Sequence, residues 1–147
     1  MEDRKSLPLA SFAAMAGSFE AVSSWVEIPH SMMAAFADLT HDRQFIHVDP
    51  VRAAAETPCG AAIAHGFLTL SLLSAFAFET APKVEGADIG INQGFDTVRF
   101  VAPVKTGARI RARFKLADLK IRPSGWVHVT NDVTIEIEDS VKPALTA

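Results

Sequence analysis

Cysteine is nearly absent from this sequence, since Cys59 is the only one among 147 residues. A single cysteine excludes an internal disulfide and a zinc site built from several thiolates. It lies in the loop-like stretch ETPCGAA. A nucleophilic role is possible there, but a buried or incidental thiol is the better interpretation.

Basic residues are not in excess either. The net charge is −3 and the pI is about 5.9, which does not suggest a nucleic-acid partner. Only residues 109–115, RIRARFK, concentrate arginine and lysine, and there the basic residues alternate with apolar ones. This period of two predicts a strand with one solvated face. The alternative is that Arg109, Arg111 or Arg113 binds an anionic ligand.

A positively charged leader is also missing, because Glu2 and Asp3 precede the first apolar run. We expect a short helix over residues 7–16 and a cytoplasmic chain. Residues 61–78 form the longest uncharged run, at the lower edge of a membrane span. The run includes polar residues such as His65 and lacks flanking basic clusters or aromatic belts. We therefore predict a helix buried on nearly all sides, and no membrane partner.

The order of elements predicts one domain over residues 1–147, with helices in the front half and strands in the back half. Pro50 at a first helical position and Asp49 as its cap predict a helix over 49–56, and Ser31 is the candidate cap of a preceding helix. The other predicted elements are a strand over 21–28, a helix over 31–39, and strands over 91–104, 108–121, 126–139 and 140–147. An antiparallel sheet wrapped around the apolar helix would bury both, which is an α+β layout.

Acidic, basic and apolar residues crowd together in FADLTHDRQFIHVDP, residues 36–50. A metal site from His41, Asp42 and His47 lacks a recognisable ligand spacing. A plain loop, with Asp49 as a cap, is the ordinary alternative, and a serine nucleophile lacks its GxSxG elbow. The remaining interpretation is an acid/base pair of Asp42 and His47. Histidine titrates near neutrality, and a carboxylate in a dry pocket has a raised pKa, so the pair can position one water and move two protons.

The stretch FADLTHDRQFIHVDPVRAA, followed by IAHGFLTLSLL, resembles the MaoC-like dehydratases, which are related to R-specific enoyl-CoA hydratases. The nearest branch includes nodulation protein N-like sequences, and the resemblance runs from SSWVEI to KPALTA. It implies a hot-dog fold, a homodimer, and no metal or other cofactor. It also implies reversible hydration of trans-2-enoyl thioesters, carried by CoA or acyl carrier protein, to (3R)-3-hydroxyacyl thioesters.

The resemblance places the catalytic aspartate on Asp42 and the catalytic histidine on His47. It places on Gly66, after His65, the glycine whose backbone N–H binds the thioester carbonyl. That position suits the role, because amides at a helix start lack intrahelical partners and the helix dipole favours a developing oxyanion. Helix packing is the alternative reason for a glycine there.

Three departures from the family pattern stand out. His41 replaces a glycine that often precedes the aspartate. Gln44 and Phe45 stand where related hydratases have Asn-Pro. Residues 96–97 are Asp-Thr where the nodulation branch often has Asn-Arg. Gln44, Phe45 and His65 join Gly66 as the expected substrate-binding residues.

Two rival functions stay open. A hot-dog thioesterase would normally have an acidic residue on the central helix, and residues 61–78 contain none. A non-catalytic acyl-thioester-binding protein would keep the pocket and lose turnover through the changes at His41 or Gln44. Helical spacing makes core packing the more common role for the large apolar residues of this helix, although some could line a pocket. They are Phe67, Leu68, Leu70, Leu72, Phe76 and Phe78.

Overall fold

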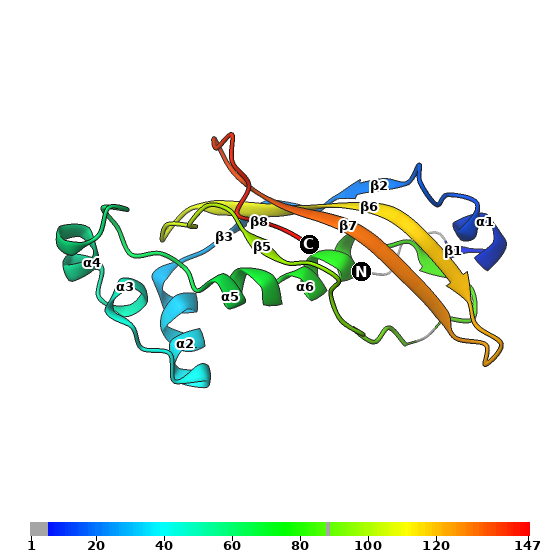
Figure 1. Cartoon of the computed structure of the whole chain (residues 1–147), viewed down its shortest axis with the longest axis horizontal. Helices are drawn as coiled ribbons and strands as arrows, with labels where there is room; N and C mark the ends of the chain where they lie inside the picture. The colour runs from blue at the N-terminus through cyan, green and yellow to red at the C-terminus, as the bar shows by residue number, and fades with distance from the viewer. Residues whose placement is uncertain (1–5, 88) are drawn as a thin grey trace.

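The computed structural model describes residues 6–87 and 89–147, so the expectations drawn from Glu2 and Asp3 lie outside the described residues. Helices gather in the front half and long strands in the back half, as Figure 1 shows. The helices are α1 (Leu9–Ala13), α2 (His30–Thr40), α3 (Phe45–Val48), α4 (Pro50–Glu56), α5 (Gly66–Ser71) and α6 (Leu73–Thr80). The strands are β1 (Ser6–Leu7), β2 (Glu20–Val22), β3 (Val26–Glu27), β4 (Lys83–Val84), β5 (Arg99–Phe100), β6 (Arg109–Ile121), β7 (Val127–Ile137) and β8 (Leu145–Thr146).

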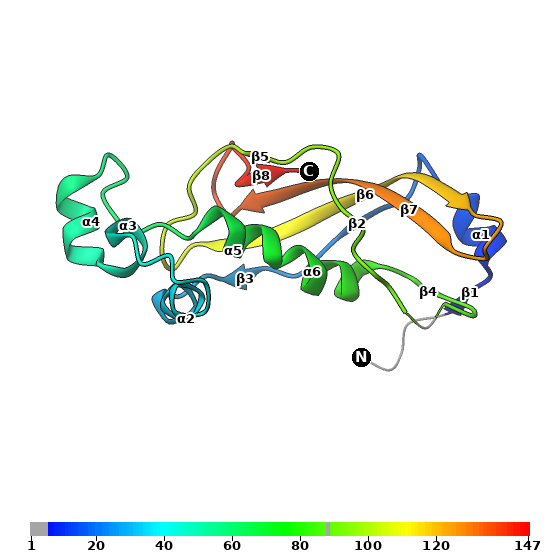
Figure 2. The same cartoon turned by 60° about the horizontal axis from the view of Figure 1, so that its bottom comes forward.

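The main sheet is built on the hairpin of β6 and β7, and the Arg122–Gly125 turn joins the two strands. Strands pair antiparallel in the order β2-β6-β7-β8-β5, and β3 pairs with the other end of β6. Helices α5 and α6 lie along the concave face of this sheet (Figures 1 and 2). The predicted α+β hot-dog layout, with a sheet wrapped around an apolar helix, is therefore confirmed.

The central helix is shorter than predicted. It begins at Gly66, as expected from the carbonyl-binding role, and not at residue 61, where the uncharged run begins, and it is interrupted at Leu72. The preceding residues are extended because they pair with other segments. Ile63 donates its N–H to Ile46, and the Ala64 N–H donates to Val104. Leu68, Leu73 and Phe76 of the helix are buried in the core together with residues from β6 and β7.

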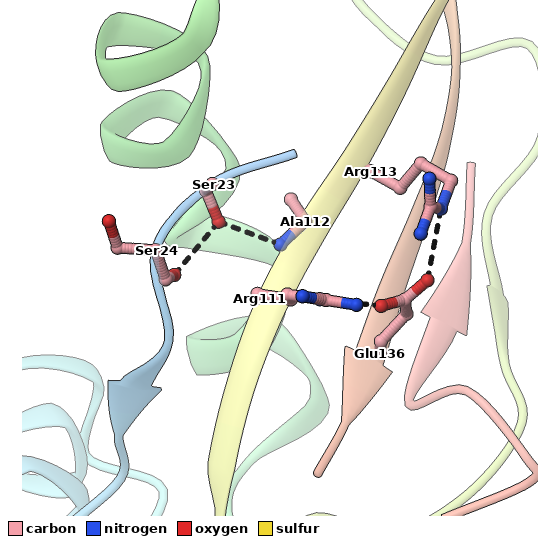
Figure 3. Close-up of polar contacts among 6 residues, drawn as sticks. All are labelled: Ser23, Ser24, Arg111, Ala112, Arg113 and Glu136. Atoms are coloured by element: carbon pink, nitrogen blue, oxygen red, sulfur yellow. Dashed lines mark hydrogen bonds and ion pairs between the residues drawn. The ribbon is translucent and has the colours of Figure 1, made fainter. Parts of the chain in front are cut away.

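Arginines 109, 111 and 113 point away from this core. Arg111 and Arg113 both bind Glu136 on β7, at 2.7 and 3.0 Å (Figure 3). Arg109 binds Glu138 at 2.9 Å. The residues between them, Ile110 and Ala112, are fully buried. The interpretation of residues 109–115 as a strand with one solvated face is thus confirmed for β6. The three guanidinium groups form ion pairs with the carboxylates of Glu136 and Glu138.

Two helix starts were predicted with different success. The Asp49 carboxylate accepts the Arg52 N–H at 2.9 Å, so it caps α4 as expected, with Pro50 at the first position. Ser31 is not a cap. Helix α2 already begins at His30, because Pro29 in an extended conformation occupies the cap position. The first helix, α1, covers only part of the predicted 7–16.

The predicted strand over 21–28 is divided in two. Ser23 lies between β2 and β3, and its N–H and its Oγ both bond to the backbone of Ala112 at 2.9 Å (Figure 3). Ser23 therefore keeps this segment hydrogen-bonded to β6 where the regular strand pairing of β2 and β3 is interrupted.

The strand predicted over 91–104 is wrong for most of its length in this chain. Among the described residues, only its β5 portion pairs as a strand, with β8. The segment before it is exposed, including Ile89 (73% exposed), Ile91 (69%) and Phe95 (55%). A strand pattern without a neighbouring strand leaves backbone groups and apolar side chains facing solvent.

Within residues 6–87 and 89–147, no helix is both long and apolar enough to cross a membrane. Most of the uncharged run forms α5 and α6, but the predicted burial on nearly all sides is wrong. Leu68, Leu73 and Phe76 are buried on one face, whereas Phe67 (69% exposed) and Phe78 (65%) face solvent. The cytoplasmic location stays a prediction.

Candidate active site

A tight reversal of the chain between α2 and α3 brings Asp42 and His47 together. Helix α2 ends at Thr40, and His41 follows with φ 62°, in the left-handed region. This conformation explains why glycine suits the position and why histidine there is strained. Asp42 comes directly after the reversal, and α3 then carries His47.

His47 is buried, with 7% of its surface exposed. Its Nδ1 lies 2.6 Å from the Ile63 carbonyl oxygen. Because a carbonyl only accepts, Nδ1 carries the proton, and Nε2 of the neutral ring keeps a free lone pair. Burial lowers the pKa of His47, and the neighbouring His65 lowers it further, while the Ile63 carbonyl and Asp42 act in the opposite direction. The ring therefore favours its neutral, basic form.

His65 is the second buried histidine, at 3% exposure, and it occupies the cap position of α5. Its Nε2 lies 2.9 Å from the backbone carbonyl of Asp42. Its ring stacks on His47, with centroids 3.7 Å apart and planes 25° apart. Side-chain atoms of Asp42, His47 and His65 all lie within 4.8 Å of one another.

In the part of the chain that the structure describes, this trio is also the only cluster close enough to hold a metal ion, and His41 is not a member. The sequence-based expectation of no metal stays a prediction. The Asp42 side chain lies at the solvent edge in the single chain. The dry surroundings expected for the pair are thus present only on the His47 side.

Gly66 is the first residue of α5, so its N–H has no acceptor within the helix. A Cβ on Gly66 would come within 2.9 Å of the Phe100 ring. Phe100 also makes an edge contact with Phe67, with centroids 5.8 Å apart, and both rings are at least half exposed. Sequence reasoning did not identify Phe100. Its only signal is its place in the VRFVAPV stretch that carries the resemblance.

The other expected substrate-binding residues lie beside the cluster. Gln44 precedes α3 and is exposed. The ring of Phe45 faces α4, where the Arg52 guanidinium lies 4.0 Å from its centroid. Phe45 therefore has a packing contact of its own, and its role toward substrate stays a prediction.

Comparisons with known proteins show which family and which solved structures this chain is similar to. The family model described as "MaoC like domain" matches residues 12–137. Nodulation protein N of Rhizobium meliloti is 50% identical over 141 residues, covering 96% of this chain and 88% of that protein. The 3-hydroxyacyl-thioester dehydratase Z of Mycobacterium tuberculosis is 45% identical over 139 residues, covering 95% and 91%. Among solved structures, the (R)-hydratase from A. caviae involved in PHA biosynthesis has a TM-score of 0.67 and 27% identity, covering 89% of this chain and 94% of that one.

Proposed function

Because this chain belongs to the family of MaoC-like domains, we propose that it is an R-specific hydratase/dehydratase of acyl thioesters. It adds water to a trans-2-enoyl thioester, carried by CoA or acyl carrier protein, to give the (3R)-3-hydroxyacyl thioester, and it catalyses the reverse reaction. Relatives named as a hydroxyacyl-thioester dehydratase and an (R)-hydratase support this reaction class.

One observation carries the proposal: the Asp42 carboxylate lies beside a buried, neutral His47 whose proton is fixed on Nδ1. In the hydration direction, His47 Nε2 takes a proton from water while the hydroxide forms a bond to Cβ. The carbon–carbon π electrons move toward the thioester, and the resulting enolate oxygen accepts the Gly66 N–H. Asp42 in its acid form gives a proton to Cα, and the proton on His47 then returns to Asp42. Dehydration uses the same steps in reverse.

Thioesterase chemistry receives less support from the central helix. The observed helix extends two residues beyond the predicted end and therefore includes Glu79. This carboxylate accepts hydrogen bonds from the Ser24 N–H at 2.7 Å and from the Ser24 hydroxyl at 2.5 Å. It lies near the far end of α6 from Gly66 and is engaged in attaching the helix to the β2–β3 connection.

The test follows the ultraviolet absorbance of short, medium and long trans-2-enoyl-CoA substrates. Hydration removes the conjugated chromophore, thioester hydrolysis releases CoA, and a simple binding protein does neither. Asp42→Asn and His47→Ala should each lower kcat by roughly 100- to 10,000-fold, because each removes a proton transfer. Their effects should not multiply, since the residues act as a unit.

Asp38→Asn is the matched control. Asp38 is an exposed carboxylate of the same stretch, paired with Arg43 at 2.9 Å. It should keep near-full activity. An active wild type whose Asp42→Asn or His47→Ala variant keeps most of that activity would remove that residue from the chemistry. A wild type that binds acyl-CoA without turnover would favour the binding protein.

We further propose that the active form is a homodimer. The segment 89–98 has a strand pattern but no strand partner among the described residues, and Ile89, Ile91 and Phe95 face solvent. Together with α5 and α6, this segment lines a large open groove. A second copy pairing edge to edge would supply the missing backbone partners and cover the groove.

A further inference from the structure

We propose that His65 is a positioning residue that holds both members of the acid/base pair, Asp42 through a hydrogen bond and His47 through ring stacking. This inference rests on the proposed function for its catalytic consequence. It goes beyond the substrate-binding role that the sequence suggested for His65.

His65 fixes Asp42 through a hydrogen bond to the backbone of the aspartate. Asp42 follows a strained left-handed residue and its side chain is exposed, so its direction depends on few contacts. The hydrogen bonds from the Asp42 N–H to Thr40 and from the Gln44 N–H to the Asp42 carboxylate are both long, at 3.4 Å. The His65 Nε2–H bond to the Asp42 carbonyl is 2.9 Å, an ordinary full-strength distance.

His65 fixes His47 by stacking on the face of its imidazole ring. The Ile63 carbonyl fixes one edge of that ring at Nδ1, and the stacked His65 ring restricts rotation about that contact. Phe36 of α2 also touches His65, with ring centroids 5.0 Å apart. His65 is therefore a buried, flat ring that packs against Phe36 of α2 on one side and stacks on the His47 imidazole.

The protonation state of His65 follows from its contacts. Nε2 must carry a proton in order to donate to a carbonyl. Nδ1 is buried and has no hydrogen-bond partner. The Nε2–H donor of His65 is therefore directed at the Asp42 carbonyl, and Nδ1 takes no part in the contacts that hold the pair.

His65 also links the pair to the carbonyl site, because Gly66 is the next residue in the chain. The N-terminal end of α5, the Asp42 backbone and the His47 ring are thereby connected through one side chain. A small displacement of His65 would move the proton donor, the base and the oxyanion donor relative to one another, and catalysis is sensitive to such displacements.

Two substitutions separate the two contacts. His65→Gln keeps an amide N–H at a reach similar to Nε2 but loses the flat ring that stacks on His47. His65→Phe keeps a flat ring but loses the N–H that donates to the Asp42 carbonyl. His65→Phe should lower kcat by about 10- to 100-fold with little change in KM, since a misplaced pair loses transition-state stabilisation rather than binding. His65→Gln should also lower kcat with little change in KM, because it leaves the His47 ring without its stacking partner. Full kcat in either variant would overturn the hold that runs through the contact which that variant loses.

A pH titration followed by imidazole ¹⁵N NMR supplies a readout that does not depend on activity. In the wild type, His47 should titrate below the ordinary value of 6.5. The titratable groups facing His47 are His65 and Asp42. Replacing His65 with Phe should raise the pKa of His47, so that the acid limb of kcat/KM moves to higher pH. His30→Gln is the control, since His30 also has a buried, unpartnered ring nitrogen but lies outside the cluster.

The outcomes are distinguishable. A His47 titration unaffected by His65→Phe would refute the positioning role whatever the activity. A wild type that shows the expected titrations but never hydrates an enoyl thioester would refute the proposed function and leave the coupling of the two histidines established.

Discussion

His41 is a residue under strain next to the proposed catalytic aspartate. Its left-handed conformation, φ 62°, costs a non-glycine residue on the order of 1 kcal/mol or more. His41→Gly should relieve this strain, partly offset by the greater freedom of glycine in the unfolded chain, about 0.5–1 kcal/mol. We expect an unchanged or higher free energy of unfolding, by up to about 1 kcal/mol, measured by urea denaturation.

Leu39→Gly is the contrast, because Leu39 is an exposed residue inside α2 with no need for a left-handed backbone. It should lower the free energy of unfolding by about 0.5–1 kcal/mol. A His41→Gly variant that is destabilised as much as this control would mean that the histidine side chain stabilises the reversal by some other contact. Hydratase activity should survive His41→Gly, since the glycine preserves the backbone on which Asp42 sits.

At Gly66, the space around the Cα determines whether a side chain can be accommodated. A methyl group there meets the Phe100 ring at 2.9 Å, too close for an ordinary contact. Removing access to one oxyanion donor lowers kcat by roughly 100- to 1000-fold, so Gly66→Ala should be severely impaired while remaining folded. The double variant with Phe100→Ala separates two causes. If the methyl group acts by blocking substrate, activity stays low; if it acts by displacing Phe100, the double variant recovers to the level of Phe100→Ala alone.

Among elements, the β2–β3 edge depends on one buried hydroxyl. Ser23 is 5% exposed, and its Oγ accepts the Ala112 N–H at 2.9 Å and donates to the Ser24 carbonyl at 3.0 Å. Ser23→Ala would leave a buried N–H of β6 without its partner, which costs about 1–3 kcal/mol. Urea denaturation should show this loss, whereas Ser18→Ala, which removes an exposed hydroxyl bonded to Met15, should change stability by less than about 0.5 kcal/mol. Equal stabilities of the two variants would mean that water replaces the lost bond.

The helices and strands also show which structural features a local sequence pattern can predict. The alternation in residues 109–115 and the Asp49-Pro50 cap are local signals, and both were correctly interpreted for β6 and α4. The resemblance placed Gly66 at the start of the helix correctly, but the apolar run alone placed that start too early, because Ile63 and Ala64 are held by Ile46 and Val104. Such partners are far away in the sequence, and an apolar run alone does not reveal them.

The same distinction applies to the candidate site. The spacing of Asp42 and His47 within one short loop, together with the resemblance, predicted that they lie together. The stacking of His65 on His47 and the cover of Phe100 over Gly66 were not predictable, because each brings together segments distant in the chain. The left-handed backbone at His41 was visible only as a departure from the family pattern.

At the scale of the whole molecule, the failed strand prediction over 91–104 becomes an argument for assembly. Its sequence pattern is that of a strand, yet the first strand there in the described part of the chain is β5, at Arg99–Phe100. Ile89, Ile91 and Phe95, which precede it, are more than half exposed. Phe67 and Phe78 on α5 and α6 are exposed beside the same groove, at 69% and 65%. An apolar surface of this kind, bordering an unpaired edge, is typical of an interface.

Phe95→Glu should therefore shift the protein from dimer to monomer in light scattering, because a buried carboxylate without a partner opposes association. Activity should fall with the dimer, since Asp42, exposed in the single chain, needs a cover to act as an acid in dry surroundings. Val141→Glu is the matched control: Val141 is just as apolar and fully exposed, at 103%, but it lies in the β7–β8 loop outside the groove. It should leave both mass and activity unchanged. A wild type that is monomeric and fully active would show instead that one chain completes the site, and that the exposed edge serves another contact.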